Sequence, residues 1–218
     1  MKSNFDNSLA ELKNIRVKLS KIGTSKKKGE VWERICIGVL DYIFKETLPL
    51  SNSYLPDGIT YFQEDDSMLW DSKGLRKTSL LQSTRKKNSK TIKDTFYIKA
   101  FKNKKFNFKY YIFITVGVKK EDFERVLEKM IKELAKLNVK DVKIACVTDK
   151  YLKKLAEVFK SQDDSSRIHK NLGQFAEIMK REFDKSYLDD LDKKIFDKIG
   201  KGRVINESEL RKEVKSLS

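Results

Sequence analysis

Three residues in the first third of the chain, Asp57, Asp71 and Lys73, have the types and spacing of a reactive site. Asp57 follows Pro56 and precedes a short apolar run, and Asp71 ends a second such run. If the two runs pair as antiparallel strands, the two aspartates lie side by side. Convergent carboxylates bind a hard cation such as Mg²⁺, which uses only one or two protein carboxylates in addition to water and substrate phosphate.

Lys73 comes two residues after Asp71, so the two side chains are on the same face of a strand. An ammonium group there can hold an attacking water molecule and offset the charge on a pentavalent phosphorus. A cation beside it lowers the pKa of bound water and screens an anionic phosphodiester. Together these residues indicate metal-dependent hydrolysis of a phosphodiester. The structural alternative is an ordinary turn at Asp57, a strand end at Asp71 and a solvated Lys73.

The elements that must position these residues follow from hydrophobic spacing along the chain. We expect a helix over 4–22, a linker over 23–29, a helix over 30–46, a β-hairpin from 58–62 and 67–71, a basic helix over 75–93, a loop to about 107, a strand over 108–116, a helix over 121–137, a strand over 142–147, a helix over 151–159, a linker over 161–166 and one or two C-terminal helices. The strand-helix-strand order near the middle predicts parallel pairing. The fold class is therefore α/β.

The composition excludes several classes of enzyme. The 218 residues include one His, His169, and two Cys, Cys36 and Cys146. Zinc sites and Ser-His-Asp or Cys-His triads need more of these side chains. Both cysteines stand among apolar residues and are expected to be buried thiols. We expect no disulfide, no leader and no membrane span, and hence a cytoplasmic protein.

The net charge of +16 is unevenly distributed. Residues 30–71 carry 2 basic and 9 acidic residues, whereas residues 72–109 carry 13 basic residues and 1 acidic residue. Clustered carboxylates followed at once by a basic block are expected where a cation lies beside a surface that holds phosphates. A solvated surface on a lysine-rich protein is the alternative.

The motif Pro56-Asp57 followed by Asp71-Ser72-Lys73 resembles that of the PD-(D/E)XK nucleases. With Gly58 to Tyr61 and Trp70 included, it is most similar to the cleavage domain of FokI-like type IIS restriction endonucleases. The similarity extends from about Val31 to the C-terminus, through 111–117, 146–149 and 207–214. It implies a restriction-endonuclease-like mixed sheet flanked by helices.

The resemblance implies a Mg²⁺-dependent endonuclease acting on double-stranded DNA, with Mn²⁺ expected to substitute. Asp57 and Asp71 would be metal ligands, the Ser72 carbonyl a third, and Lys73 the partner of the attacking water. Family members place a glutamate on the preceding helix, and Glu33 matches that position best, with Glu30 as the alternative. Glu33 could equally be a surface or helix-pairing carboxylate.

The division implied for the chain is an N-terminal helix and basic linker over 1–29, a nuclease core over 30–160 and a C-terminal helical extension of the same domain over 161–218. Type IIS enzymes carry a separate recognition domain, and about 30 residues before the similarity are too few for one. We therefore expect recognition to come from a separate subunit. A stable homodimer is not expected, because the basic run over 85–90 would oppose itself across a two-fold axis. The rival interpretations are a structure-specific nuclease of the repair or resolvase type and a non-catalytic, basic nucleic-acid-binding module.

The basic block predicts how affinity for DNA responds to salt. The expected phosphate contacts are Arg76, Lys77, Arg85, Lys86, Lys87, Lys90 and Lys93. Each contact adds about 0.9 to the slope of log affinity against log salt concentration. Neutralising Arg85, Lys86 and Lys87 together should flatten that slope, measured by fluorescence anisotropy on a DNA duplex. An unchanged slope and affinity would identify the block as a solvated or protein-binding surface.

Overall fold

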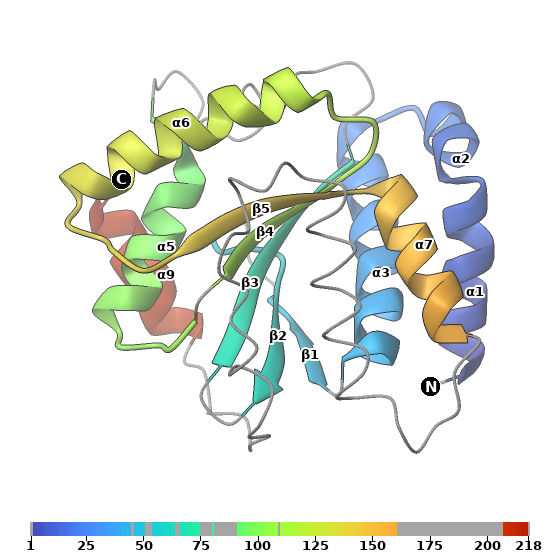
Figure 1. Cartoon of the computed structure of the whole chain (residues 1–218), viewed down its shortest axis with the longest axis horizontal. Coiled ribbons are helices and arrows are strands. Elements are labelled where there is room, and N and C mark those ends of the chain that lie inside the picture. The colour runs from blue at the N-terminus through green and yellow to red at the C-terminus, as the bar shows by residue number, and fades with distance from the viewer. Residues whose placement is uncertain are drawn as a thin grey trace.

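The two apolar runs beside Asp57 and Asp71 pair as antiparallel strands in the computed structural model, as the sequence predicts (Figure 1). They form β2 (Gly58–Gln63) and β3 (Asp66–Lys73). The structure describes residues 2–44, 46–50, 54–63, 66–74, 80, 91–108, 110–160 and 207–217. The predicted linker over 161–166, most of the predicted basic helix over 75–93, and His169 lie outside these ranges.

The sheet has five strands in the order β1-β2-β3-β4-β5. β1 (Glu46–Pro49) pairs antiparallel with β2, whereas β4 (Tyr110–Thr115) pairs parallel with both β3 and β5 (Lys143–Thr148). β3 is thus the central strand, where antiparallel pairing gives way to parallel pairing. The expected α/β class and the parallel pairing of β4 with β5 are confirmed.

One face of the sheet is covered by the N-terminal helices and one later helix (Figure 1). These are α1 (Lys2–Lys13), α2 (Ile15–Lys21), α3 (Ser25–Ile43) and α7 (Asp149–Lys160). Their apolar side chains pack with Trp70 of β3 and with Ile112 and Ile114 of β4. The indole nitrogen of Trp32 donates a hydrogen bond to the Ile114 carbonyl at 2.9 Å, which fixes α3 against the sheet.

The other face is covered by α5 (Lys93–Asn103), α6 (Lys120–Lys136) and α9 (Glu207–Leu217). Their core includes Leu69 of β3 with Tyr111 and Phe113 of β4. Successive residues of β4 therefore enter opposite clusters, and all six are buried, as its apolar sequence predicts. The expected burial of Cys36 and Cys146 is also confirmed, and both thiols are free.

The N-terminal region differs from the prediction. The single helix expected over 4–22 is two helices, because Asn14 leaves the helical conformation with φ −117° and ψ 19°. The linker expected over 23–29 is mostly helix: α3 begins at Ser25, with the Thr24 hydroxyl accepting a hydrogen bond from the Lys27 amide. Capping by Thr24 thus outweighs the run of lysines and glycine that suggested a linker.

Two further elements were not predicted. The loop expected to reach about residue 107 contains helix α5, whose Tyr97, Ile98 and Phe101 are buried against the sheet. The helix expected to run through Glu46 ends at Ile43, and Glu46 already belongs to β1. Both elements depend on partners distant in sequence, which override weak local preferences.

No helix in the described part of the chain is long and apolar enough to cross a membrane. α1 packs against α3 and α7, and α9 packs against α5, where the Asn103 side-chain amide donates to Glu213 at 2.6 Å. The first and last described helices therefore both pack against other helices of the same fold.

Gly58 fixes the approach of β2 to β3 next to Asp57. A Cβ at Gly58 would lie 2.2 Å from Cζ2 of Trp70, and 3.0 Å from the Leu48 carbonyl oxygen. Gly58→Ala should therefore destabilise the fold by about 1–3 kcal/mol, measured by urea denaturation. Gly29→Ala is the matched control: no atom lies within 4 Å of its Cβ, and in a helix it should stabilise by up to about 1 kcal/mol. Equal effects of the two changes would contradict this view of the strand contact.

Candidate active site

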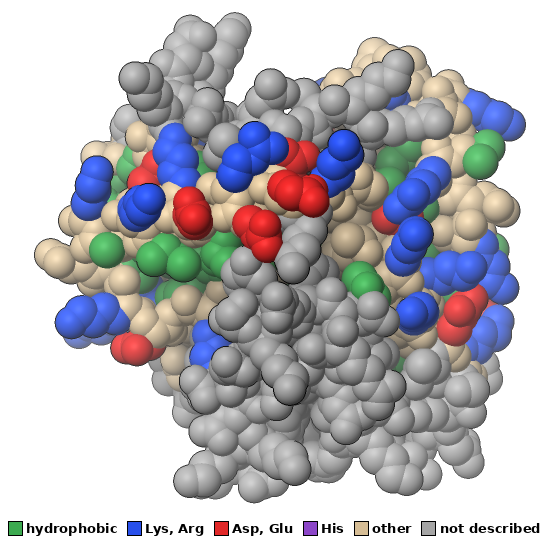
Figure 2. Space-filling model, turned by 45° about the horizontal axis from the view of Figure 1, so that its top comes forward, with side chains coloured by type: hydrophobic (Ala, Val, Ile, Leu, Met, Phe, Trp, Pro, Cys, Tyr) green, Lys and Arg blue, Asp and Glu red, His purple; other side chains and the backbone are tan. Residues whose placement is uncertain are grey.

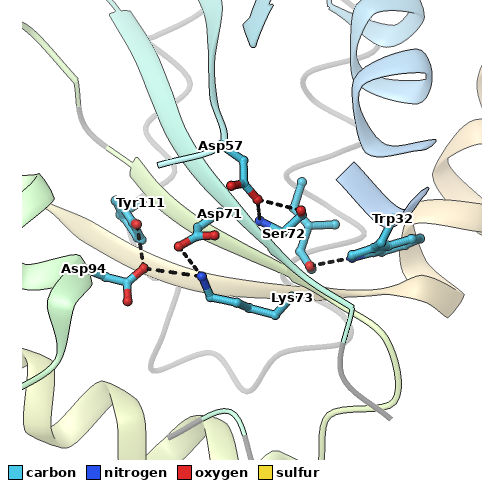
Figure 3. Close-up of polar contacts among 8 residues, drawn as sticks. Trp32, Asp57, Asp71, Ser72, Lys73, Asp94 and Tyr111 are labelled. Carbon is cyan, nitrogen blue, oxygen red and sulfur yellow. Dashed lines mark hydrogen bonds and ion pairs between the residues drawn. The ribbon is translucent and has the colours of Figure 1, made fainter. Parts of the chain in front are cut away.

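The β2–β3 register brings Asp57 and Asp71 together. Gly58 pairs with Trp70, so the next residues outward, Asp57 and Asp71, lie opposite each other at the end of the ladder. The Oδ2 atom of Asp57 accepts hydrogen bonds from the Ser72 amide at 2.7 Å and from the Ser72 hydroxyl at 2.6 Å (Figure 3). The structure thus brings Asp57 and Asp71 together as expected, whereas the role of the Ser72 carbonyl as a metal ligand stays a prediction. These bonds fix the Asp57 carboxylate toward β3.

Lys73 is buried beside Asp71. Its ammonium donates to Oδ2 of Asp71, and its side chain is only 8% exposed. Both residues lie on the face of β3 that is covered by α5, as their two-residue spacing requires. The alternative of a solvated lysine is therefore wrong for Lys73.

Lys73 has a second acidic neighbour besides Asp71, and the sequence did not identify it as a site residue. Oδ1 of Asp94 lies 3.9 Å from the Lys73 ammonium nitrogen and accepts a hydrogen bond from the Tyr111 hydroxyl at 2.8 Å. Asp94 is fully buried in the first turn of α5 (Figure 3). The signal in the sequence was that Asp94 is the one acidic residue in the basic block over 72–109.

The first turn of α5 is held in place by α6. One carboxylate oxygen of Glu133 accepts hydrogen bonds from the Ile92 amide at 3.0 Å and from the Thr95 hydroxyl at 3.2 Å. An unpaired amide at a buried helix start would be costly, so Glu133 stabilises this end of α5. Asp94 lies between these two contacts, and its position is fixed accordingly.

Lys93 was expected to contact DNA but lies at the carboxylate cluster. It is half-buried at the start of α5, with its ammonium 5.6 Å from the centre of the Tyr97 ring. Burial lowers the pKa of Lys93, but the charges of Asp71 and Asp94 outweigh it and raise the pKa overall. The other six expected DNA contacts, Arg76, Lys77, Arg85, Lys86, Lys87 and Lys90, lie outside the described residues.

Glu33 approaches the same cluster from α3. It is half-buried, and burial together with the charge of Asp71 raises the pKa of its carboxyl group. Glu30 is exposed and lies 3.9 Å from the Lys26 ammonium. The geometry therefore favours Glu33 over Glu30 as the helix glutamate near the site, and its role as an outer ligand stays a prediction.

Burial and mutual repulsion perturb the carboxylates. Burial and the charge of Asp71 raise the pKa of Asp57 to about 7. Burial also raises the pKa of Asp94, with Asp71 adding to the shift, whereas Lys73 and Lys93 outweigh burial at Asp71 and lower its pKa. Asp71 is thus the ionised carboxylate of the cluster, and Asp57 is the group that a nearby cation would ionise.

The donor set suits a hard cation held by few protein ligands. Within the described ranges, no three Asp, Glu, His or Cys side chains converge as a ready-made metal cluster. Asp57 keeps one carboxylate oxygen that Ser72 does not engage, and Asp71 lies opposite it. Two carboxylates that repel each other fit Mg²⁺, which retains waters and needs only one or two protein carboxylates.

The described part of the face shown in Figure 2 has mixed charge. On the face shown in Figure 2, basic and acidic side chains are interspersed. α6, which turns toward the viewer there, contains five basic and five acidic residues. α6 is therefore not a uniformly basic surface of the kind that binds phosphates.

No protein-family model matches this chain, and neither curated proteins nor solved structures gave a match.

The raised pKa of Asp57 predicts a pH-dependent stability. Ionising Asp57 costs free energy in the folded state, so its destabilisation is absent below about pH 4, grows up to about pH 7 and is complete above. In EDTA, Asp57→Asn should raise the free energy of unfolding on the order of 2 kcal/mol more at pH 8 than at pH 4. Urea denaturation at both pH values measures the difference. The same change at both would show that Asp57 ionises freely in the folded protein.

Proposed function

We propose that this chain is a Mg²⁺-dependent endonuclease that hydrolyses phosphodiester bonds of double-stranded DNA. The observation that supports it most is the convergence of Asp57, Asp71 and Lys73 at the end of one hairpin. These are the residues in which the chain resembles the PD-(D/E)XK nucleases. Burying Lys73 with the carboxylates of Asp71 and Asp94 is costly for stability alone, so a functional role explains their placement better than a structural one.

The charge of the cluster also supports a divalent cation. The electrostatically connected groups are the carboxylates of Glu33, Asp57, Asp71 and Asp94 and the ammonium groups of Lys73 and Lys93. Without a cation, burial and mutual repulsion raise the pKa of Glu33, Asp57 and Asp94; with all four carboxylates ionised, they would outnumber the two ammonium groups by two, which is the charge of one Mg²⁺ ion. A divalent cation would offset this charge and so allow the carboxylates to ionise together.

Each residue has a role in the proposed reaction. Asp57 and Asp71 hold the cation, with the Ser72 carbonyl as a third ligand and Glu33 beyond them, while the Ser72 amide and hydroxyl orient Asp57. When bound, Mg²⁺ screens the anionic phosphodiester and activates a water molecule; Mn²⁺ is expected to substitute. The Lys73 ammonium orients the attacking water and offsets the charge that develops on the phosphate.

We further propose that this nuclease is the cleavage subunit of a type IIS-like restriction enzyme whose recognition function is on another polypeptide. α1 packs against α3 and α7, so the N-terminal helices are part of this fold and do not form a separate recognition domain. This assignment would be supported if DNA is cut at a fixed distance from a recognition sequence, and only when a partner such as the product of the neighbouring gene is present. Cleavage of branched DNA without a partner would instead favour a repair nuclease.

Plasmid nicking tests the reaction itself. The wild-type chain should nick supercoiled plasmid in Mg²⁺ and not in EDTA. Asp71→Ala and Lys73→Ala should each reduce the rate on the order of 10²–10³-fold, because each removes several kcal/mol of transition-state stabilisation.

Asp122→Ala and Lys153→Ala are matched controls, since they remove an aspartate on α6 and a lysine on α7 outside the site. Both should cut at the wild-type rate. Circular dichroism checks that all four variants are folded. Wild-type rates from folded Asp71→Ala and Lys73→Ala would refute the assignment and leave a basic binding module.

A further inference from the structure

Lys73 lies between two buried carboxylates that hold it unequally. Its ammonium donates to Oδ2 of Asp71, whereas Oδ1 of Asp94 is 3.9 Å away, beyond hydrogen-bond distance (Figure 3). Oδ1 of Asp94 accepts from the Tyr111 hydroxyl, and Oδ2 of Asp94 is buried with no N–H or hydroxyl donor beside it. Asp94 can donate a hydrogen bond to Asp71 only while its own carboxyl group is protonated. Once a cation holds Asp71 and Asp94 is ionised, this oxygen would be left without a donor, which is costly in a buried site.

A cation and Lys73 compete for Asp71. The ammonium engages one Asp71 oxygen, and a divalent cation on the same carboxylate would repel it. Lys73 is buried, so its charge cannot simply move into water. It needs a second acceptor within reach, and the Asp94 carboxylate, whose Oδ1 lies 3.9 Å from the ammonium nitrogen, is such an acceptor.

Asp94 itself is held so that the lysine must move toward it. Tyr111 of β4 bonds one of its oxygens, and the surrounding turn of α5 is fixed by Glu133 through the Ile92 amide and the Thr95 hydroxyl. The long side chain of Lys73 has the rotatable bonds to shift by the small distance required.

We infer that Asp94 is a positioning residue that takes over the Lys73 ammonium when a divalent cation occupies Asp71. This inference rests on the proposed nuclease function. The transfer keeps Lys73 charged and in a defined position beside the reacting phosphate. It also lowers the cost of cation binding, because the ammonium does not have to leave the protein interior.

A double-mutant cycle on Mg²⁺ affinity tests the transfer without measuring cleavage. Titration calorimetry compares wild type, Asp94→Asn, Lys73→Met and the double variant. If Asp94 contributed only its negative charge, Asp94→Asn would weaken Mg²⁺ binding equally in the wild-type chain and in the Lys73→Met variant. If Asp94 receives the Lys73 ammonium, Asp94→Asn should weaken Mg²⁺ binding about tenfold when Lys73 is present. In the Lys73→Met background the same change should weaken binding by no more than about threefold. Equal weakening in the two backgrounds would overturn the inference, whereas a wild-type chain that binds no Mg²⁺ would overturn the proposed function and this inference with it.

A conservative variant gives a second test that does not require the loss of a buried charge. Tyr111→Phe removes only the hydroxyl that holds Asp94, and Tyr110→Phe is its matched control on the opposite face of β4. Tyr111→Phe should lower kcat for plasmid nicking about fivefold with KM for DNA unchanged, and should weaken Mg²⁺ binding, while Tyr110→Phe does neither. Identical behaviour of the two variants in both measurements would overturn the inference.

Discussion

The burial of a charged lysine at the end of β3 constrains everything around it. A buried ammonium group is tolerated only with anionic partners, and Asp71 and Asp94 provide them from β3 and α5. Asp94 in turn needs Tyr111 of β4 and a fixed helix start, which Glu133 of α6 supplies. Two helices on one face of the sheet and the neighbouring strand β4 are thereby arranged around a single side chain.

This constraint explains why the site lies at the central strand. β3 pairs antiparallel with β2 and parallel with β4, so its end is next to a hairpin strand on one side and a crossover strand on the other. The hairpin side contributes Asp57, and the crossover side contributes Tyr111. The chain between β3 and β4 includes α5, which brings Asp94 and Lys93 back over the same strand end.

The sequence was most informative where structure is local. The β2–β3 hairpin and the juxtaposition of Asp57 with Asp71 follow from alternating apolar runs and a short turn, and β4 and β5 follow from their continuous apolar residues. Asp94 and Tyr111 could not be predicted as site residues, because their meeting depends on how α5 packs on β4. α5 itself was missed because its apolar residues are interrupted by lysines, and β1 because four residues form a strand only when β2 is there to pair with.

β1 has a further consequence for the hairpin. It covers the outer side of β2, and the hydrogen bond from the Leu50 amide to the Asp57 carbonyl extends that cover by one more pair, at 2.9 Å. β1 is short and ends in Pro49, which has no amide hydrogen to offer to a further strand. Short strands and prolines at a sheet edge discourage strand addition by other molecules. The segment that presents Asp57 is therefore kept one strand away from the edge of the sheet, where strands of other molecules could pair.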